Sequence, residues 1–128
     1  MSSRPLKLFF DGGCRPNPGR IEAAVVVRGV SHLFDDLGQG SNMDAEWLAL
    51  LKALELAQHL GERDFVLLGD ARAVIAQANG QAKCRSAAMQ AHFARFAALI
   101  QPGFPVRIRW IARTQNLAGI ALAARHQR

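Results

Sequence analysis

The pattern of apolar and polar residues in the first third of the chain is typical of β-strands. Short apolar runs rich in Val, Ile, Leu and Phe occupy residues 5–10 and 21–30, and the second run is continuous enough for a central strand of a sheet. Residues 31–40 are a weaker candidate for a third strand. No helical segment separates these runs, so we expect neighbouring strands to pair antiparallel.

The pattern changes after residue 40, where helix-forming residues begin to predominate. Residues 44–60 consist largely of Ala, Leu, Glu and Lys, and Gly61 follows as a stop signal. Ser41 precedes Asp44 by three positions, which is the spacing of a capping box. The sequence therefore predicts a long helix over 44–60, capped by Ser41 or Asn42.

Strands and helices alternate in the rest of the chain. The run 64–70 predicts a short buried strand, and residues 105–112 alternate in polarity as a half-buried strand does. We expect helices at 71–78, 86–100 and 117–125. One face of the 105–112 strand carries Val106, Ile108 and Trp110, and the other carries Arg107 and Arg109.

This order of elements predicts the fold class. Antiparallel strands followed by strands that alternate with helices indicate an α/β fold, in which helices flank a mixed five-stranded sheet. No repeat, low-complexity segment or linker interrupts the 128 residues, so we expect a single domain over 1–128. Ligands of such sheets bind at the carboxyl ends of the parallel strands.

Composition argues against several classes of protein. The N-terminal apolar stretch is too short for a signal peptide or a membrane span. Cys14 and Cys84 form neither a metal-binding pair nor a disulfide framework. We therefore expect a cytoplasmic protein without membrane association, and nothing in the sequence implies a protein partner.

Charge is distributed very unevenly along the chain. Residues 1–70 contain 7 Lys or Arg and 10 Asp or Glu, whereas residues 71–128 contain 9 Lys or Arg and no acid. A segment this basic is typical of proteins that bind a polyanion, because neutralised phosphates release counterions. A solvated basic surface is the alternative interpretation.

Three acids stand where catalytic groups are expected. Asp11 follows the first strand, Asp70 ends the 64–70 strand, and Glu46 lies in the first turn of the long helix. Each has a structural explanation when taken alone, such as the helix macrodipole for Glu46. Three carboxylates gathered at one end of a sheet would repel one another unless a divalent cation lies between them, and their oxygens suit Mg²⁺ or Mn²⁺.

Four sequence blocks carry a resemblance to a known family. DGGCRPNPG, SNMDAEWLALLKAL, LLGDARAVIAQANG and IARTQNLAGIALA resemble, in order and at similar spacing, the motif blocks of the type 1 ribonuclease H family. The resemblance extends over about residues 6–124 and is to the short form without a basic protrusion. It implies a ribonuclease H-like fold and an endonuclease that hydrolyses the RNA strand of RNA/DNA hybrids with two Mg²⁺ or Mn²⁺ ions.

The resemblance also implies roles for individual residues. Asp11, Glu46 and Asp70 match the first three catalytic, metal-binding carboxylates of the family. The Gly12–Asn17 segment and Asn42 match positions that contact the 2′-hydroxyls of RNA, and Arg113 matches a phosphate contact. The full set of expected nucleic-acid contacts is Gly12, Gly13, Cys14, Arg15, Asn17, Asn42, Arg72, Arg113 and Asn116.

The fourth acid of the family pattern is missing. That block reads approximately Asn-x-x-Ala-Asp-x-Leu-Ala, and Ile120 stands at the aspartate position. Isoleucine has no ligand atom, and no acid follows Asp70. Asn116, one helical turn earlier on the same face, offers at most a neutral amide oxygen. Gly119 in place of the alanine weakens this helix by roughly 1 kcal/mol.

Two functions are compatible with these observations. The first is a metal-dependent ribonuclease H that is slowed by its incomplete set of acids. The second is a catalytically inactive, nucleic-acid-binding module with the same fold. The three remaining acids and the Gly12–Asn17 segment favour the enzyme, whereas Ile120 favours the binding module.

Overall fold

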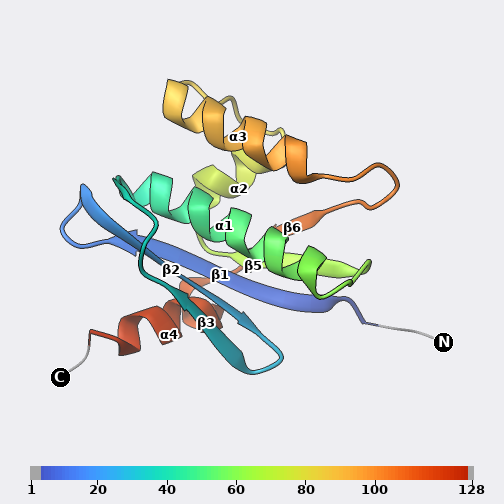
Figure 1. Ribbon diagram of the computed structural model, residues 1–128, viewed down its shortest axis with the longest axis horizontal. Coiled ribbons are helices and arrows are strands. Elements are labelled where there is room, and N and C mark those ends of the chain that lie inside the picture. The colour runs from blue at the N-terminus through green and yellow to red at the C-terminus, as the bar shows by residue number, and fades with distance from the viewer. Residues whose placement is uncertain (1–3, 127–128) are drawn as a thin grey trace.

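A mixed sheet forms the centre of the computed structural model, which describes residues 4–126 (Figure 1). Its main strands lie in the order β3-β2-β1-β5-β6, and the short strand β4 pairs only with β2. The strand bounds are β1 (Leu6–Cys14), β2 (Gly19–Val27), β3 (Val30–Phe34), β4 (Gln39–Gly40), β5 (Phe65–Gly69) and β6 (Arg107–Trp110). Strands β1, β2 and β3 pair antiparallel, while β5 is parallel to both β1 and β6. The predicted α/β class with a mixed sheet is confirmed.

Helices cover both faces of the sheet. The bounds are α1 (Asn42–His59), α2 (Arg72–Ala78), α3 (Ala87–Leu99) and α4 (Leu117–Ala124), with the 3₁₀ turn η1 (Arg113–Gln115) before α4. Helices α1, α2 and α3 lie on one side of the sheet and α4 lies on the other (Figure 1). The main core lies between α1 and the sheet, where Leu8, Phe10, Trp47, Leu50 and Leu54 have no exposed surface.

The start of α1 has the predicted capping box. The Asp44 N–H donates to the Ser41 hydroxyl, and the Ser41 N–H donates to Asp44 Oδ2 at 2.9 Å. Both interactions satisfy backbone N–H groups that a helix N-terminus otherwise leaves without partners. Because the box closes at Ser41, the helix starts at Asn42, and Glu46 lies beyond the first turn in which we expected it.

Strand β1 is longer than its sequence suggests. Asp11 pairs with Ala24 inside the β1–β2 ladder, and the strand continues to Cys14, so Asp11 does not follow the strand as expected. Gly12 and Gly13, which lie beyond the strand predicted over residues 5–10, are also strand residues. Gly12 is required by packing, since a Cβ there would overlap the backbone carbonyl of Ala45 on α1.

Two further segments differ from the sequence interpretation. The expected strand 31–40 is divided into β3 and β4, and β3 follows a tight turn in which Arg28 and Gly29 both have positive φ angles. Strand β6 begins only at Arg107, and Trp110 at its end is 40% exposed, whereas Ile108 is buried. The alternation therefore indicated the strand correctly but not the environment of Trp110.

Among the described residues, no helix combines the length and apolar character that crossing a membrane requires. Cys14 and Cys84 are both free thiols.

The contact between β1 and α1 can be tested with two neighbouring glycines. Gly12→Ala should lower the free energy of unfolding by more than about 2 kcal/mol, because the methyl group would overlap Ala45. Gly13→Ala is the matched control, since an added Cβ there meets only Asn42 Oδ1 at 3.9 Å. Urea denaturation measures the free energy of unfolding of both variants. Equal losses of stability would show that the close approach of α1 to Gly12 is unimportant.

Candidate active site

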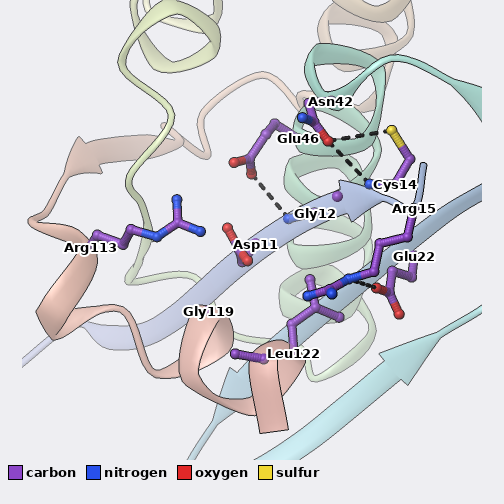
Figure 2. Close-up of a pocket in the computed structure, with 12 residues that line it drawn as sticks. Asp11, Gly12, Cys14, Arg15, Glu22, Asn42, Glu46, Arg113, Gly119 and Leu122 are labelled. Atoms are coloured by element: carbon purple, nitrogen blue, oxygen red, sulfur yellow. Dashed lines mark hydrogen bonds and ion pairs between the residues drawn. The ribbon is translucent and has the colours of Figure 1, made fainter. Parts of the chain in front are cut away.

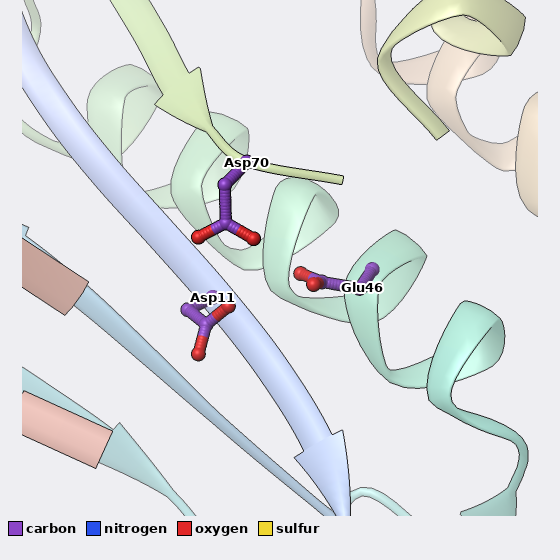
Figure 3. Close-up of side chains that lie close together, drawn as sticks. All are labelled: Asp11, Glu46 and Asp70. Atoms are coloured by element: carbon purple, nitrogen blue, oxygen red, sulfur yellow. The ribbon is translucent and has the colours of Figure 1, made fainter. Parts of the chain in front are cut away.

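Three acidic side chains from separate elements meet at one edge of the sheet (Figure 3). The parallel pairing of β1 with β5 ends at Phe9 and Leu68. Asp11 and Asp70 each lie two residues further on, so the register places them opposite each other. Glu46 on α1 completes the group, and one oxygen of each carboxylate lies within 4.8 Å of the others. The structure thus brings together the three acids that the sequence singled out.

Two of the three carboxylates are oriented by a hydrogen bond from a backbone or side-chain amide. The Gly12 N–H donates to Glu46 Oε1 at 3.1 Å. Asn116 Nδ2 donates to Asp70 Oδ2 at 2.8 Å and to the Phe10 carbonyl at 3.0 Å. Asp11 itself is fixed by its position in the β1–β2 ladder.

Asn116 has a different place from the one we expected. It is completely buried, and its Oδ1 accepts from the Ala118 N–H as the N-cap of α4. A direct contact with nucleic acid is incompatible with this burial, and the oxygen we considered as a metal ligand is already used. Asn116 is therefore a positioning residue for Asp70.

Burial and mutual repulsion change the protonation of this cluster. Burial, reinforced by the charges of Asp11 and Asp70, raises the pKa of Glu46 to about 9. Burial and the charge of Asp70 raise the pKa of Asp11 to about 6, while the guanidinium of Arg113 acts in the opposite direction on both groups. The protein therefore holds these carboxylates in a place where their negative charge is poorly compensated.

A divalent cation fits this arrangement. The donors are three carboxylates, the hard oxygen ligands that Mg²⁺ and Mn²⁺ prefer. Within residues 4–126, no Lys, Arg or His nitrogen lies within 4.0 Å of the carboxylate of Asp11 or Glu46, and Arg113 Nη1 lies 4.0 Å from Asp70 Oδ1. A bound cation would supply the compensating charge that the protein itself provides only weakly.

Asp11 and Glu46 open onto a cavity of about 410 Å³ (Figure 2). It is lined by Asp11, Gly12, Gly13, Cys14, Arg15, Glu22, Asn42, Glu46, Arg113, Gly119, Leu122 and Ala123. Six of the expected nucleic-acid contacts are in this lining, and exposed Asn17 adjoins it through a hydrogen bond from the Asn42 N–H at 3.1 Å. Arg72 lies outside the lining, on the exposed start of α2.

The segment after Asp11 is tied to α1 through Asn42. Asn42 Oδ1 accepts from the Cys14 N–H at 3.2 Å and lies 3.3 Å from Cys14 Sγ. Because the N–H groups of Gly12 and Cys14 already bind the protein, they are not available as donors to a ligand. The side-chain Nδ2 atoms of exposed Asn17 and Asn42 have no partner in the described residues.

Glu22 is a lining residue that the sequence analysis missed. It pairs with Gly13 in the ladder, and its carboxylate lies 3.7 Å from Arg15, 3.4 Å from Arg125 and 2.6 Å from His126. The signal was a single acid inside the otherwise apolar run 21–27. Glu22 thereby holds the guanidinium groups of Arg15 and Arg125 beside the cavity.

Helix α4 presents a glycine to the acids. A Cβ at Gly119 would lie 3.6 Å from Asp11 Oδ2, whereas Ile120 is 55% exposed and does not line the cavity. Ile120 therefore neither fills the site nor packs in the core, and no carboxylate of α4 reaches the cluster.

Neutralising Asp11 should stabilise the metal-free protein at alkaline pH. The pKa of Asp11 is higher in the folded state than in the unfolded state, so its contribution to stability is greatest below about pH 4 and falls as pH rises through about 6. At pH 8, Asp11→Asn should raise the free energy of unfolding by on the order of 2 kcal/mol, with a smaller gain at pH 5.

Chemical denaturation of the chelator-treated protein measures this effect. Asp36→Asn, at an exposed carboxylate, is the control and should change little. Added Mg²⁺ should stabilise the unmodified protein more than Asp11→Asn, because it binds only the folded site. An Asp11→Asn variant less stable than the parent at pH 8 would contradict the repulsion described here.

Comparison with known proteins extends these observations. A family model described as reverse transcriptase-like matches residues 9–126. Ribonuclease HI of Halobacterium salinarum is 39% identical over 77 residues, which cover 56% of this chain and 39% of that protein. The chain spans 33–39% of the length of the curated relatives that it matches.

Solved structures agree with the family match. The crystal structure of RNase H1 from Halobacterium salinarum has a TM-score of 0.83 at 28% identity, over 93% of this chain and 94% of that chain. LC11-RNase H1, isolated from compost, is also similar in its complex with an RNA/DNA hybrid, with a TM-score of 0.78 at 26% identity over 91% and 92% of the two chains. The chain therefore belongs to the reverse transcriptase-like family and has an RNase HI-like fold.

Proposed function

We propose that this protein is a metal-dependent ribonuclease H, an endonuclease that hydrolyses the RNA strand of RNA/DNA hybrids in the cytoplasm through one domain over residues 1–128. The observation that carries the proposal is the group formed by Asp11, Glu46 and Asp70, whose oxygens lie within 4.8 Å of one another beside an open cavity. The similarity to LC11-RNase H1, solved with such a hybrid, supports this substrate.

The three carboxylates would hold Mg²⁺ or Mn²⁺. When bound, such an ion supplies a Lewis acid that stabilises charge on the leaving 3′ oxygen or lowers the pKa of the attacking water. The chain provides the geometry for it, since Gly12 orients Glu46 and Asn116 orients Asp70. Asp70 and Glu46 need no large movement to share one ion with Asp11.

The cavity lining would hold the RNA strand. The side-chain amides of Asn17 and Asn42 present their nitrogens as donors to 2′-hydroxyls, the groups that distinguish RNA from DNA. Gly12, Gly13 and Cys14 keep the floor of the cavity free of bulky side chains, which allows the backbone of the RNA to approach closely. Because the N–H groups of Gly12 and Cys14 already bind the protein, these residues would contact the RNA through their carbonyl oxygens or by van der Waals contact.

Two arginines at the cavity would bind phosphates. Arg113 has an 84% exposed side chain near Asp70, and Arg15 has a 62% exposed side chain beside Glu22. Both can reach a phosphate without breaking a buried contact. Their charges also offset the repulsion between the carboxylates and an incoming polyanion.

The absence of a fourth acid favours a second candidate function. With Ile120 exposed and Gly119 facing Asp11, the attacking water would have fewer groups to position it. A module that binds hybrids without cutting them is therefore the alternative.

Cleavage of an end-labelled RNA/DNA hybrid tests the proposed function. We expect Mg²⁺- or Mn²⁺-dependent cutting of the RNA strand only, abolished by chelation and reduced by at least about a hundredfold in Asp11→Asn. The same RNA as a single strand is the substrate control. If the unmodified protein binds the hybrid but cuts it no faster than the background rate without protein, the binding module is supported instead.

Restoring an acid on α4 separates slow catalysis from none. Ile120→Asp should raise the cleavage rate by about tenfold or more, because it restores the aspartate of the family pattern next to Gly119, the residue of α4 that faces Asp11, and a carboxylate there can help to position the attacking water. Its stability should change little, since Ile120 is 55% exposed. Ile120→Asn is the matched control of similar size without charge. If Ile120→Asp binds metal and hybrid but cuts no faster than Asp11→Asn, the catalytic proposal is wrong.

A further inference from the structure

An arginine and an exposed tryptophan form a stacked pair next to the acidic cluster. The Arg72 guanidinium carbon lies 3.7 Å from the centroid of the Trp110 ring. Arg72 is exposed at the start of α2, and Trp110 is 40% exposed at the end of β6. The two side chains come from different elements, so their stacking is a tertiary contact that fixes an otherwise flexible arginine.

The pair is connected directly to one of the candidate metal ligands. Trp110 Nε1 donates to the backbone carbonyl of Asp70 at 3.1 Å, while the carboxylate of Asp70 is held by Asn116. Asp70 is thus fixed at its backbone by one residue and at its side chain by another. Arg72 follows Asp70 by two positions, which keeps its charge close to the site.

Arg72 has no acidic partner among the described residues, a property that it shares with Arg85 and Arg109 but not with the other arginines of residues 71–126. Arg95, Arg107, Arg113 and Arg125 each pair with a carboxylate of residues 1–70. In the part of the chain that the structure describes, no carboxylate oxygen lies within 4.0 Å of Arg72. Stacking covers one face of the exposed guanidinium and leaves the N–H groups at its edge without a carboxylate partner, which suits binding of a phosphate by two hydrogen bonds.

We propose that Arg72, held by Trp110, is a binding site for a backbone phosphate of the nucleic acid outside the cavity, and that Trp110 is the positioning residue that keeps it there. The proposal rests on the proposed function for the identity of the nucleic acid. It adds a contact beyond the cavity lining, on the far side of Asp70 from the Gly12–Asn17 segment. Because Arg72 contacts none of the three acids, the proposed phosphate contact contributes affinity rather than bond cleavage.

Binding of a fluorescently labelled RNA/DNA hybrid to the Asp11→Asn protein tests the phosphate contact without cleavage. Arg72→Gln should weaken binding roughly tenfold, the effect of losing a charge-assisted hydrogen bond. It should also reduce the slope of log Kd against log salt by about one, as expected for one phosphate. Arg28→Asn removes an equal charge at the β2–β3 turn, where Asn tolerates the positive φ, and should leave both quantities nearly unchanged.

A double-mutant cycle tests the role of Trp110. Trp110→Leu should weaken binding about as much as Arg72→Gln, because the arginine loses its stacking surface. Trp110→Phe keeps an aromatic face and should recover most of the affinity. In the Arg72→Gln background, Trp110→Leu should cause little further loss. Additive losses would show that Trp110 does not act through Arg72.

Intrinsic fluorescence can distinguish a role of Trp110 in binding from a purely structural role, because a purely structural role predicts no change in its emission when the hybrid binds. Trp110 and Trp47 are the two tryptophans, and Trp47 is completely buried. Titration with an unlabelled hybrid should therefore change the emission of Trp110 alone, and the change should disappear in Trp110→Leu. It should be much smaller in Arg72→Gln at equal saturation.

The outcomes separate this inference from the proposed function. If the Asp11→Asn protein binds the hybrid no better than double-stranded DNA of the same length, the proposed substrate is wrong. If it binds the hybrid preferentially but Arg72→Gln changes neither affinity nor salt slope, the substrate remains and the phosphate site is wrong. Loss of affinity without a change in salt slope would likewise overturn the phosphate contact.

Discussion

Mutual repulsion among three partly buried carboxylates is the constraint on which the rest of the site depends. Asp11, Glu46 and Asp70 lie close together where water can screen their charges only weakly. Such an arrangement destabilises the folded protein unless a cation is bound. The protein therefore needs a scaffold stable enough to hold these groups in place before any cation arrives.

That scaffold consists of the sheet and the helix packed on it. The parallel register of β1 and β5 places two of the acids opposite each other, and the close approach of α1 to Gly12 brings in the third. The core beneath α1 is fully buried over Leu8, Phe10 and Trp47, so local rearrangement at the acids is opposed by packing throughout the domain. Stability in the core thus offsets repulsion at the edge.

The sequence was sufficient for the order of the elements and for the three acids, because periodicity and motif spacing are local properties of the chain. It was less informative where distant segments decide the outcome. Gly12 and Gly13 lie beyond the predicted first strand, yet they belong to β1 because they pair with β2, and Gly12 also lets Ala45 of α1 approach closely. Trp110 continued an apolar alternation, yet an arginine of α2 rather than the core covers it.

Two site residues illustrate the same limit. The motif marked Asn116 as a nucleic-acid contact, but the structure shows that its side-chain amide is buried and hydrogen-bonds to the Phe10 carbonyl, to Asp70 and to the Ala118 N–H. Glu22 had no motif at all, and its place beside the cavity follows from its pairing with Gly13. Hydrogen-bond partners and cross-strand neighbours of this kind cannot be read from spacing along one chain.

The hydrogen bonds of Asn116 also explain how α4 can lose its acid without disturbing the remaining site. The helix contributes to the cluster by orienting Asp70 from its N-cap, and this contribution does not involve the side chain at position 120. Anchoring and metal ligation are therefore independent properties of the same helix. A single substitution at exposed position 120 can therefore add or remove a carboxylate without breaking the hydrogen bonds by which Asn116 orients Asp70.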